Sequence, residues 1–424
     1  MQNLKKDFKI FENYKNKNNS VLTYLDTAAS SLTPKAVTDK LLEYYEEYRS
    51  NIDRGLYKTA IDATSEYDAV RAKTAKFIGV ETEDVIFTSG STAASNMLVN
   101  LIEKHMTDYR DSAGVNLYLE KDEILVSVYA HHSDLLPLQE YAKRNNLKIK
   151  MIAPDLKLES RENSQKYFEK FVSSINEKTL LVSHPSVSNV TGEIFDIKKI
   201  SEEANKIKAF IVSDMTSAAG HIDIDVKSLG IHAGYFSPHK MCGPTGVGVL
   251  YLDRNYSRTM TPVNFGGGMV WEVSDESSTY RSDVKVFEAG TANIADVIAF
   301  GASIDYLNAV GILNIHEHVK DLVEYAKKEF IDNFDGKIKV YASETGDNAG
   351  IISFDVFGIH PHDVAEVLAR DSVCVRAGHH CAQPLMRHYG LPALSRVSFY
   401  IYNDKADVDI LMNSLKKVLT LFAK

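Results

Sequence analysis

The chain of 424 residues contains few cysteines, no excess of positive charge and no long apolar run. Three cysteines in a chain of this length cannot form a disulfide framework, so they indicate a reducing compartment. The formal net charge of −9 leaves no basic face for a phosphate backbone, which argues against nucleic acid as a partner. No signal-peptide core or membrane-length apolar segment is found, so we expect a cytoplasmic protein without a membrane partner.

Short apolar runs alternate with helix-length segments through the first three quarters of the chain. This alternation predicts an α/β fold, in which a mainly parallel sheet is covered by helices. Strands are expected at residues 85–88, 123–128, 147–152, 179–183, 209–214 and 246–252, and helices at 34–49 and 63–77.

The order of elements changes near residue 312, which predicts a second, smaller α+β domain. A helix is expected at 312–334, strands at 338–341, 351–356 and 373–376, and further helices from 362 and 406. We therefore expect an N-terminal segment, 1–33, that packs on the small domain, a large domain, 34–305, and a small C-terminal domain, 306–424.

A lysine and an aspartate predict a reactive amine beside a carboxylate. Lys240 lies 26 residues after Asp214, in a loop whose neighbours Pro238, Met241 and Cys242 would desolvate an ammonium group. Desolvation lowers the pKa of a lysine and favours an amine that can form a Schiff base. Asp214 follows an apolar run and could protonate a pyridine nitrogen or, alternatively, cap a turn.

A single cysteine lies in a loop bounded by glycine and proline, between Arg376 and Pro384. Such a loop can present the Cys381 thiolate to a substrate. Together with a carbonyl-trapping lysine and a carboxylate for a ring nitrogen, it suggests pyridoxal-phosphate chemistry on a sulfur-bearing amino acid. The other two cysteines, Cys242 and Cys374, are most simply packing residues.

Three weaker signals accompany these residues. Ser91 and Thr92 at a helix start could hold a phosphate, although either could be an ordinary N-cap. Either His131 or His132 could stack on a cofactor ring, but a histidine at a strand end is more often structural. Arg396 could clamp a substrate carboxylate or form a surface salt bridge.

A metal site is not expected. The ligand-type residues do not form a Cys-x-x-Cys or His-Glu-x-x-His pattern, and three adjacent side chains cannot easily face one ion. The residues concerned are His360, His362, His379, His380 and Cys381.

The chain resembles class V aminotransferase-fold enzymes, and most of all the Suf-type (group II) cysteine desulfurases and selenocysteine lyases. The Gly-His-His-Cys-Ala run at 378–382 is specific to the group II branch, whereas the lysine motif and the phosphate turn are shared more widely. The matching segments are 24–29, 54–55, 87–92, 131–132, 188–192, 239–240, 287–291, 376–384 and Arg396.

The resemblance implies a homodimeric fold-type-I enzyme that uses pyridoxal 5′-phosphate. Lys240 would form the Schiff base, Asp214 would pair with the pyridinium nitrogen, and His131 would stack on the ring. Cys381 would take sulfur from L-cysteine as a persulfide, leaving alanine, and a sulfur-acceptor protein would be the partner. Asn189 and Ser217 would lie by the phenolic oxygen, Arg396 and Asn189 would bind substrate, and Ser91, Thr92, Ser237, His239 and Thr291 of the second subunit would hold the phosphate.

Departures from the family pattern leave the substrate open. The family usually has glutamine where Ser217 stands, glycine at Pro238, and histidine and glutamate at Asp53 and Ala130. Asp53 would add negative charge near a site for a carboxylate. Selenocysteine lyase, cysteine-sulfinate desulfinase and aminotransferase activities are the alternatives, and a non-catalytic scaffold is a further one that Lys240 and Cys381 disfavour.

Overall fold

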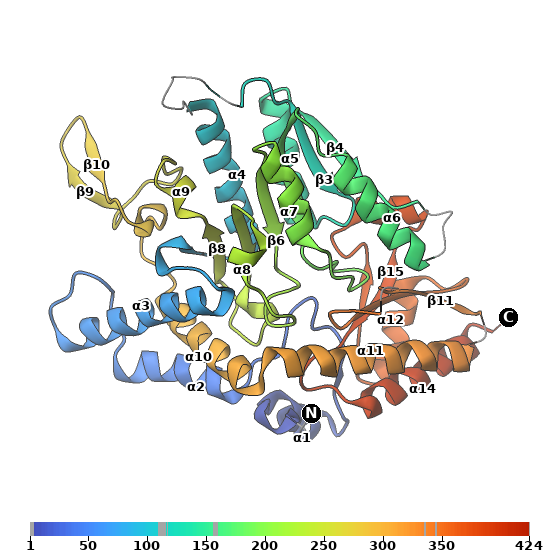
Figure 1. Ribbon diagram of the computed structural model, residues 1–424. Helices are drawn as coiled ribbons and strands as arrows, with labels where there is room; N and C mark the ends of the chain where they lie inside the picture. The colour runs from blue at the N-terminus through green and yellow to red at the C-terminus, as the bar shows by residue number, and fades with distance from the viewer. Residues whose placement is uncertain are drawn as a thin grey trace.

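A seven-stranded sheet forms the centre of the computed structural model, which describes residues 4–108, 116, 118–155, 160–334, 336–343 and 346–423. The strand order is β2-β8-β7-β6-β5-β3-β4 (Figure 1). β8 runs antiparallel to both neighbours and the other pairs are parallel, which confirms the predicted α/β class. The strands are Val85–Thr88 (β2), Glu123–Ser127 (β3), Lys148–Ile152 (β4), Thr179–Pro185 (β5), Phe210–Asp214 (β6), Ala233–Phe236 (β7) and Gly248–Leu252 (β8).

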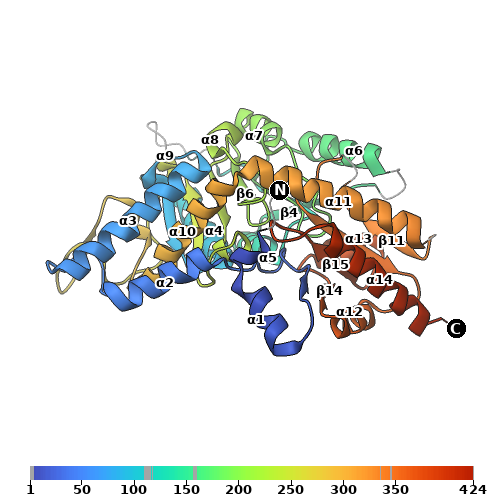
Figure 2. The same ribbon diagram turned by 90° about the horizontal axis from the view of Figure 1, so that it is seen from below.

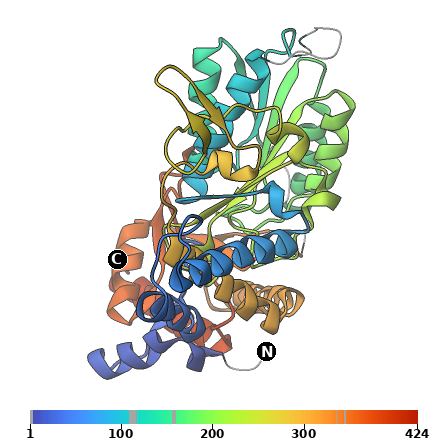
Figure 3. The ribbon, with the colours of Figure 1, turned by 90° about the vertical axis from the view of Figure 1, so that its left-hand side faces the viewer.

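Helices cover both faces of this sheet, and successive strand residues alternate between two apolar cores. Ile124 and Val126 lie in the core under α4 and α5, whereas Leu125 lies in the core under α6 and α7. Figure 3 shows the two groups of helices on opposite sides of the strands. The helices are Ser91–Asp108 (α4), His132–Arg144 (α5), Ser160–Ser173 (α6), Ile197–Lys206 (α7) and Val226–Leu229 (α8).

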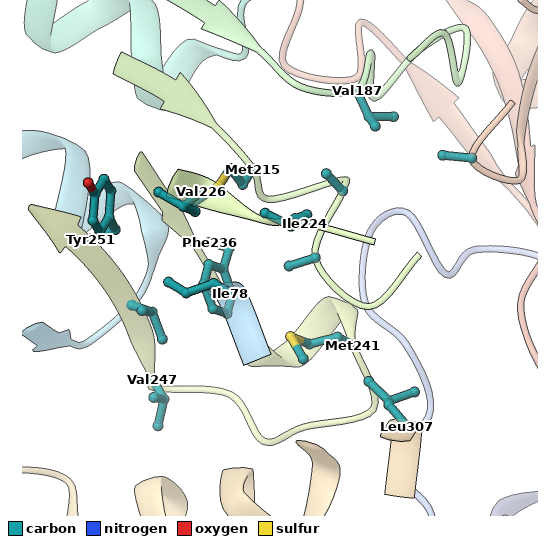
Figure 4. Close-up of a cluster of buried hydrophobic side chains, with 14 of the residues drawn as sticks. Ile78, Val187, Met215, Ile224, Val226, Phe236, Met241, Val247, Tyr251 and Leu307 are labelled. Atoms are coloured by element: carbon teal, nitrogen blue, oxygen red, sulfur yellow. The ribbon is translucent and has the colours of Figure 1, made fainter. Parts of the chain in front are cut away.

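The core on the α7 side extends to three helices outside the alternating part of the chain: α2 (Lys35–Glu47), α3 (Lys58–Ile78) and α10 (Ile294–Val310). Figure 4 shows Ile78 beside Phe236, and Leu307 beside Met241, in this core. α2 and α3 confirm the two predicted helices. α10 was not predicted because it is apolar and buried on nearly all sides, so it has no amphipathic pattern.

A second, antiparallel sheet of order β11-β12-β15-β14 forms the C-terminal part of the molecule (Figure 2). Its apolar core is closed by α11, α12 and α14. The strand β15 was not predicted, although it lies between β12 and β14. The elements are Ile312–Phe334 (α11), Ile338–Tyr341 (β11), Ile351–Val356 (β12), Pro361–Arg370 (α12), Arg376–Gly378 (β14), Leu394–Ser398 (β15) and Lys405–Leu421 (α14).

The N-terminal segment contacts the C-terminal part of the chain. It contains a short 3-10 turn (Lys5–Asp7), α1 (Lys9–Asn18) and β1 (Thr23–Tyr24), while residues 1–3 lie outside the described residues. β1 pairs with β13 (Val373–Cys374). The prediction of one strand at 373–376 is therefore wrong, because β13 joins β1 while β14 joins β15. The division into segments 1–33, 34–305 and 306–424 stays a prediction.

The remaining elements are short. They are a hairpin of β9 (Val270–Val273) and β10 (Ser278–Tyr280), 3-10 turns at Thr82–Asp84, Pro238–Lys240 and Val284–Phe287, and the helices α9 (Arg254–Ser257) and α13 (Gln383–Tyr389). Within the described part of the chain, no single helix has the length and apolar composition of a membrane span, and only α10 and α11 taken together, bent by 73°, meet that test.

Candidate active site

A cavity of about 210 Å³ lies where the carboxyl ends of β6 and β7 face the C-terminal sheet. Ligand sites in α/β proteins are commonly found at such strand ends. The cavity brings together side chains from the large sheet, from α4 and α5, and from the small sheet. Its lining contains every predicted site residue except Ser237 and Thr291, namely Ser91, Thr92, His131, Asn189, Asp214, Ser217, His239, Lys240, Cys381 and Arg396.

Lys240 enters this cavity from a 3-10 turn that follows β7. Burial, together with the positive charge of Arg396, lowers the pKa of Lys240 to about 8 against the opposite effect of Asp214. The amine is therefore deprotonated in a larger fraction of molecules near neutral pH than an exposed lysine would be. The sequence-based expectation of a desolvated lysine agrees with this environment.

Asp214 is the last residue of β6 and its carboxylate is buried beside the cavity. The backbone N–H of Thr216 donates a hydrogen bond of 2.9 Å to its Oδ1. Burial raises the pKa of Asp214, which favours sharing a proton with a basic nitrogen placed against it. Thr216, which the sequence did not identify, lines the same cavity.

A second buried carboxyl group lies behind Asp214. Asp134, in the first turn of α5, accepts hydrogen bonds from Tyr235 Oη (2.7 Å) and Ser183 Oγ (2.8 Å). Tyr235 stands in register beside Asp214 on the neighbouring strand, so this network fixes the start of α5 on the sheet. Burial raises the pKa of Asp134 to about 7, and the nearby charge of Asp214 adds to the rise.

The turn before α4 is suited to a phosphate group. Ser91 begins this helix, and its backbone N–H donates a hydrogen bond of 2.7 Å to Ser237 Oγ. A cavity that adjoins this turn is lined by Ser91, Thr92, Ser237 and His239. Gly248 on β8 passes so close that an added Cβ would lie 2.3 Å from the Gly90 carbonyl carbon, so glycine is required there.

His131 is the N-cap of α5 and lies half-buried at the cavity. Its Nδ1 accepts a hydrogen bond of 3.1 Å from the Ser133 backbone N–H. Burial lowers the pKa of His131 to about 3, with a further contribution from Lys240, so the ring is neutral at physiological pH. A neutral ring in this position can lie against an aromatic cofactor without adding charge.

Arg396 approaches from β15 and is almost completely buried. Its Nη1 donates to the Asn189 carbonyl at 2.8 Å, and its Nη2 lies 3.5 Å from Asp26 Oδ1. Burial lowers the pKa of Arg396 to about 10, which leaves the guanidinium charged at neutral pH. Asp26 also binds the exposed Arg376 at 3.1 Å, a link across the sequence that no local pattern could indicate.

Four buried polar atoms of residues that line the cavity have no hydrogen-bond partner among the described residues. They are Asn189 Oδ1, Thr216 Oγ1, His380 Nδ1 and Arg396 Nε. Buried polar groups are normally paired, so these atoms indicate a polar ligand. A buried amine, a buried carboxylate and the turn at α4 supply the remaining contacts that pyridoxal phosphate requires, and the residues therefore fit this cofactor.

Cys381 is exposed at the mouth of the cavity, in the loop between β14 and α13. His380 and Cys381 both adopt left-handed backbone conformations, with φ of 52° and 54°. For residues with a side chain, this conformation costs roughly 1–2 kcal/mol each, so contacts must hold it. By contrast, Cys242 is buried and Cys374 half-buried, and burial raises the pKa of both thiols.

The departures from the family pattern lie in different surroundings. Ser217 is buried in the lining of the cavity, whereas Ala130 packs in the core under α5. Asp53, with φ of 76°, lies with Thr291 in a separate cavity of about 280 Å³. There its carboxylate is paired with Lys285 at 2.7 Å, so its charge does not face Lys240 within one chain.

The residues weighed for a metal do not form a metal site. His360 and His362 lie at the start of α12, with ring centroids 5.0 Å apart. His380 Nε2 donates a hydrogen bond of 3.0 Å to the Leu394 carbonyl. Across the ranges that the structure describes, no three His, Cys, Asp or Glu side chains gather in a metal-binding group.

Comparisons with known proteins agree with this geometry. The family model described as aminotransferase class-V matches residues 23–411. The chain is 39% identical over 406 residues to a probable cysteine desulfurase of Halalkalibacterium halodurans, covering 96% of this chain and 95% of that protein.

Two solved structures have the same fold. The apo structure of a cysteine desulfurase from Thermococcus onnurineus NA1 has a TM-score of 0.87 at 30% identity, covering 99% of this chain and 98% of that one. The cysteine desulfurase CsdA of Escherichia coli, as an S-sulfonic acid, has a TM-score of 0.85 at 28% identity, covering 98% and 97%.

Proposed function

The chain belongs to the class V aminotransferase family, and we propose that it is a pyridoxal-phosphate-dependent cysteine desulfurase that converts L-cysteine to L-alanine and keeps the sulfur as a persulfide on Cys381. One observation carries the proposal. A single cavity is lined by Lys240 and Asp214 from the large sheet and by Arg396 and Cys381 from the small one. An amine, a carboxylate, a carboxylate receptor and a thiol are the groups that this reaction needs.

Pyridoxal phosphate, when bound, withdraws electrons from the α-carbon of the amino acid. Lys240 would attach it through Nζ, Asp214 would hold a proton at the ring nitrogen, and His131 would lie against the ring. Ser91, Thr92, Ser237 and His239 would bind the phosphate at the start of α4. Asn189 and Ser217 would lie on the phenolic side.

Arg396 would bind the substrate carboxylate through its guanidinium, with Asn189 beside it. Since Asp26 and the Asn189 carbonyl already fix this guanidinium, little side-chain entropy is lost when the substrate binds. Lys240 Nζ, with its lowered pKa, can accept the α-proton near neutral pH.

Sulfur transfer requires the exposed thiol. The Cys381 thiolate attacks the sulfur of the substrate, forming a sulfur–sulfur bond while the carbon–sulfur bond breaks. The electron pair of the broken bond stays with the substrate carbon, which takes up a proton and leaves as alanine. Because Cys381 lies at the mouth of the cavity, the persulfide can be reached by a separate sulfur-acceptor protein.

A homodimer would complete the phosphate site. Thr291 lies outside the cavity of its own chain, beside Arg54 in the second cavity, so a second copy would present it to the first copy's phosphate. Sedimentation should give a dimer, and Thr291→Ala should weaken retention of pyridoxal phosphate. A fully active monomer would refute this arrangement.

The central test is an assay of the purified, cofactor-loaded protein on cysteine, cysteine sulfinate and selenocysteine. We expect sulfide and alanine in equal amounts from cysteine in the presence of a thiol reductant, and a mass gain of one sulfur atom on the peptide that contains Cys381. Keto-acid formation without sulfide would identify an aminotransferase instead. A higher kcat/KM on selenocysteine or cysteine sulfinate would reassign the substrate.

A further inference from the structure

The strained loop that carries Cys381 is held by hydrogen bonds from other elements. Asn189 Nδ2 donates to the His380 carbonyl at 2.6 Å, and His380 Nε2 lies 3.0 Å from the Leu394 carbonyl. These contacts fix the residue before the thiol. Neither contact involves Cys381 itself or the residues that follow it.

His132 holds the loop at the Cys381 carbonyl and at the residues that directly follow it. Its backbone N–H donates a hydrogen bond of 2.8 Å to the Cys381 carbonyl. Its ring Nε2 accepts one of 3.2 Å from the Gln383 backbone N–H. One residue therefore binds both the carbonyl of the nucleophile and the first residue of α13.

The ring can accept this hydrogen bond only while Nε2 carries no proton. Burial lowers the pKa of His132, and the nearby Arg387 lowers it further, so the neutral form dominates at neutral pH. The ring of His131 lies 6.4 Å away between centroids and is neutral as well.

His132 is also rigidly placed relative to the cofactor side of the cavity. It is the first residue of α5, directly after His131, which lines the cavity. Two residues further on, Asp134 is buried and bound by Ser183 of β5 and Tyr235 of β7. The first turn of α5 therefore has a fixed distance from the large sheet, and the thiol loop is attached to that turn.

We propose that His132 is a positioning residue for sulfur transfer, which holds the Cys381 loop at a fixed distance from the substrate through the hydrogen bond from Gln383 to its ring. This inference rests on the proposed role of Cys381 as sulfur acceptor. Removing the ring acceptor leaves the strained loop attached by fewer contacts, so Cys381 spends less time within reach of the substrate sulfur. Cysteine binding and cofactor binding depend on other residues and stay as they are.

The test compares His132→Leu with His132→Gln in the cofactor-loaded enzyme. Gln places an oxygen near the position of Nε2 and can accept the same hydrogen bond. We expect His132→Leu to lower kcat for sulfide formation at least tenfold, with KM for cysteine and the visible cofactor spectrum unchanged, and His132→Gln to restore most of the rate. Hydrogen exchange should show faster exchange of the Gln383 amide in His132→Leu and wild-type exchange in His132→Gln.

A matched control is available at the start of α12. His360 Nδ1 accepts a hydrogen bond of 3.2 Å from the His362 backbone N–H, the same kind of contact at the same length, outside the lining of the Lys240 cavity. His360→Leu should leave kcat unchanged. Wild-type kcat and wild-type exchange in His132→Leu would overturn the proposal, and so would equal losses of kcat in the Leu and Gln variants. Absence of a Cys381 persulfide in the wild-type enzyme would instead refute the proposed function.

Discussion

The Lys240 turn and the Cys381 loop place two reactive groups in opposite surroundings. Lys240 lies inside the cavity, on a turn that directly follows a buried strand, and burial lowers its pKa. Cys381 is exposed, its backbone is left-handed, and residues distant in sequence hold it. The difference follows from chemistry: an amine has to lose a proton, which burial favours, whereas a thiol that passes on sulfur has to be reached from outside.

The largest effect is expected from Lys240→Met, which removes the buried amine and keeps the side-chain volume. Turnover should vanish, because no other buried amine faces Asp214 in the described lining of the cavity. The visible band of the attached cofactor should vanish too. An unchanged absorption spectrum would show that the cofactor is attached elsewhere.

The same variant gives a stability test in the cofactor-free protein. The pKa of Lys240 is about 8 in the folded chain against an ordinary value of 10.5, so the unfolded chain binds more protons between these values and wild-type stability rises with pH in that window. Below pH 8 Lys240 is protonated in both the folded and the unfolded chain, so the buried ammonium lowers the free energy of unfolding by a constant amount. Lys240→Met should therefore raise the free energy of unfolding at pH 7 by on the order of 2 kcal/mol. Urea titration should show this difference shrinking from pH 8 to 10.5.

Cys381→Ser tests the role of the exposed thiol. A hydroxyl keeps the shape of the side chain but does not attack sulfur, so sulfide formation should be lost while the cofactor spectrum still responds to cysteine. Because the substitution lies outside the buried core, the free energy of unfolding should change little. Full activity, or a persulfide mapped to Cys242 or Cys374, would contradict the role of Cys381.

A smaller effect is expected from Arg396→Lys, which keeps the charge but loses the planar fork. Since the guanidinium also binds the Asn189 carbonyl and Asp26, a lysine cannot make all of these contacts. KM for cysteine should rise roughly 10-fold to 100-fold, equal to about 1.4–2.8 kcal/mol of binding, with a smaller change in kcat. Steady-state kinetics with cysteine and with cysteamine, which lacks the carboxylate, should show the loss only for cysteine.

The smallest effect concerns Ser217→Gln, at the buried edge of the cavity. A glutamine can reach the phenolic oxygen of the cofactor directly, so the pH titration of the visible band should shift and activity on cysteine should rise relative to cysteine sulfinate and selenocysteine. Superimposable titrations and the same substrate ranking would show that Ser217 is a neutral replacement.

Elements with a clear local pattern were predictable from the sequence. The strands β2 to β6 and the helices α2, α3 and α11 lie where the alternation of apolar runs placed them. Among the buried elements that were not predicted, two were missed for clear physical reasons. α10 is apolar all round, and β15 reads Leu-Ser-Arg-Val-Ser, in which the polar residues are buried by tertiary contacts that no short window contains.

The residues of the candidate site divide in the same way, into those with a local sequence pattern and those without one. Lys240, Asp214 and Cys381 could be predicted from their neighbours in sequence. Apolar residues flank Lys240, Asp214 ends an apolar run, and glycine and proline bound the loop of Cys381. Asp26 and His132 gain their positions from partners far along the chain, which are Arg376 for Asp26 and Gln383 for His132. A single sequence carries no signal for those pairs.

The pairing of β14 with β15 has a mechanical consequence. Arg376 and Arg396 stand opposite each other across these strands, and the Cys381 loop begins directly after β14. Arg396, the proposed receptor for the carboxylate, and the loop of Cys381, the proposed sulfur acceptor, are therefore joined by the backbone hydrogen bonds of one sheet. Because Asn189 binds both Arg396 and the His380 carbonyl, the distance between the guanidinium and the thiol loop is set from the large sheet as well as from the small one.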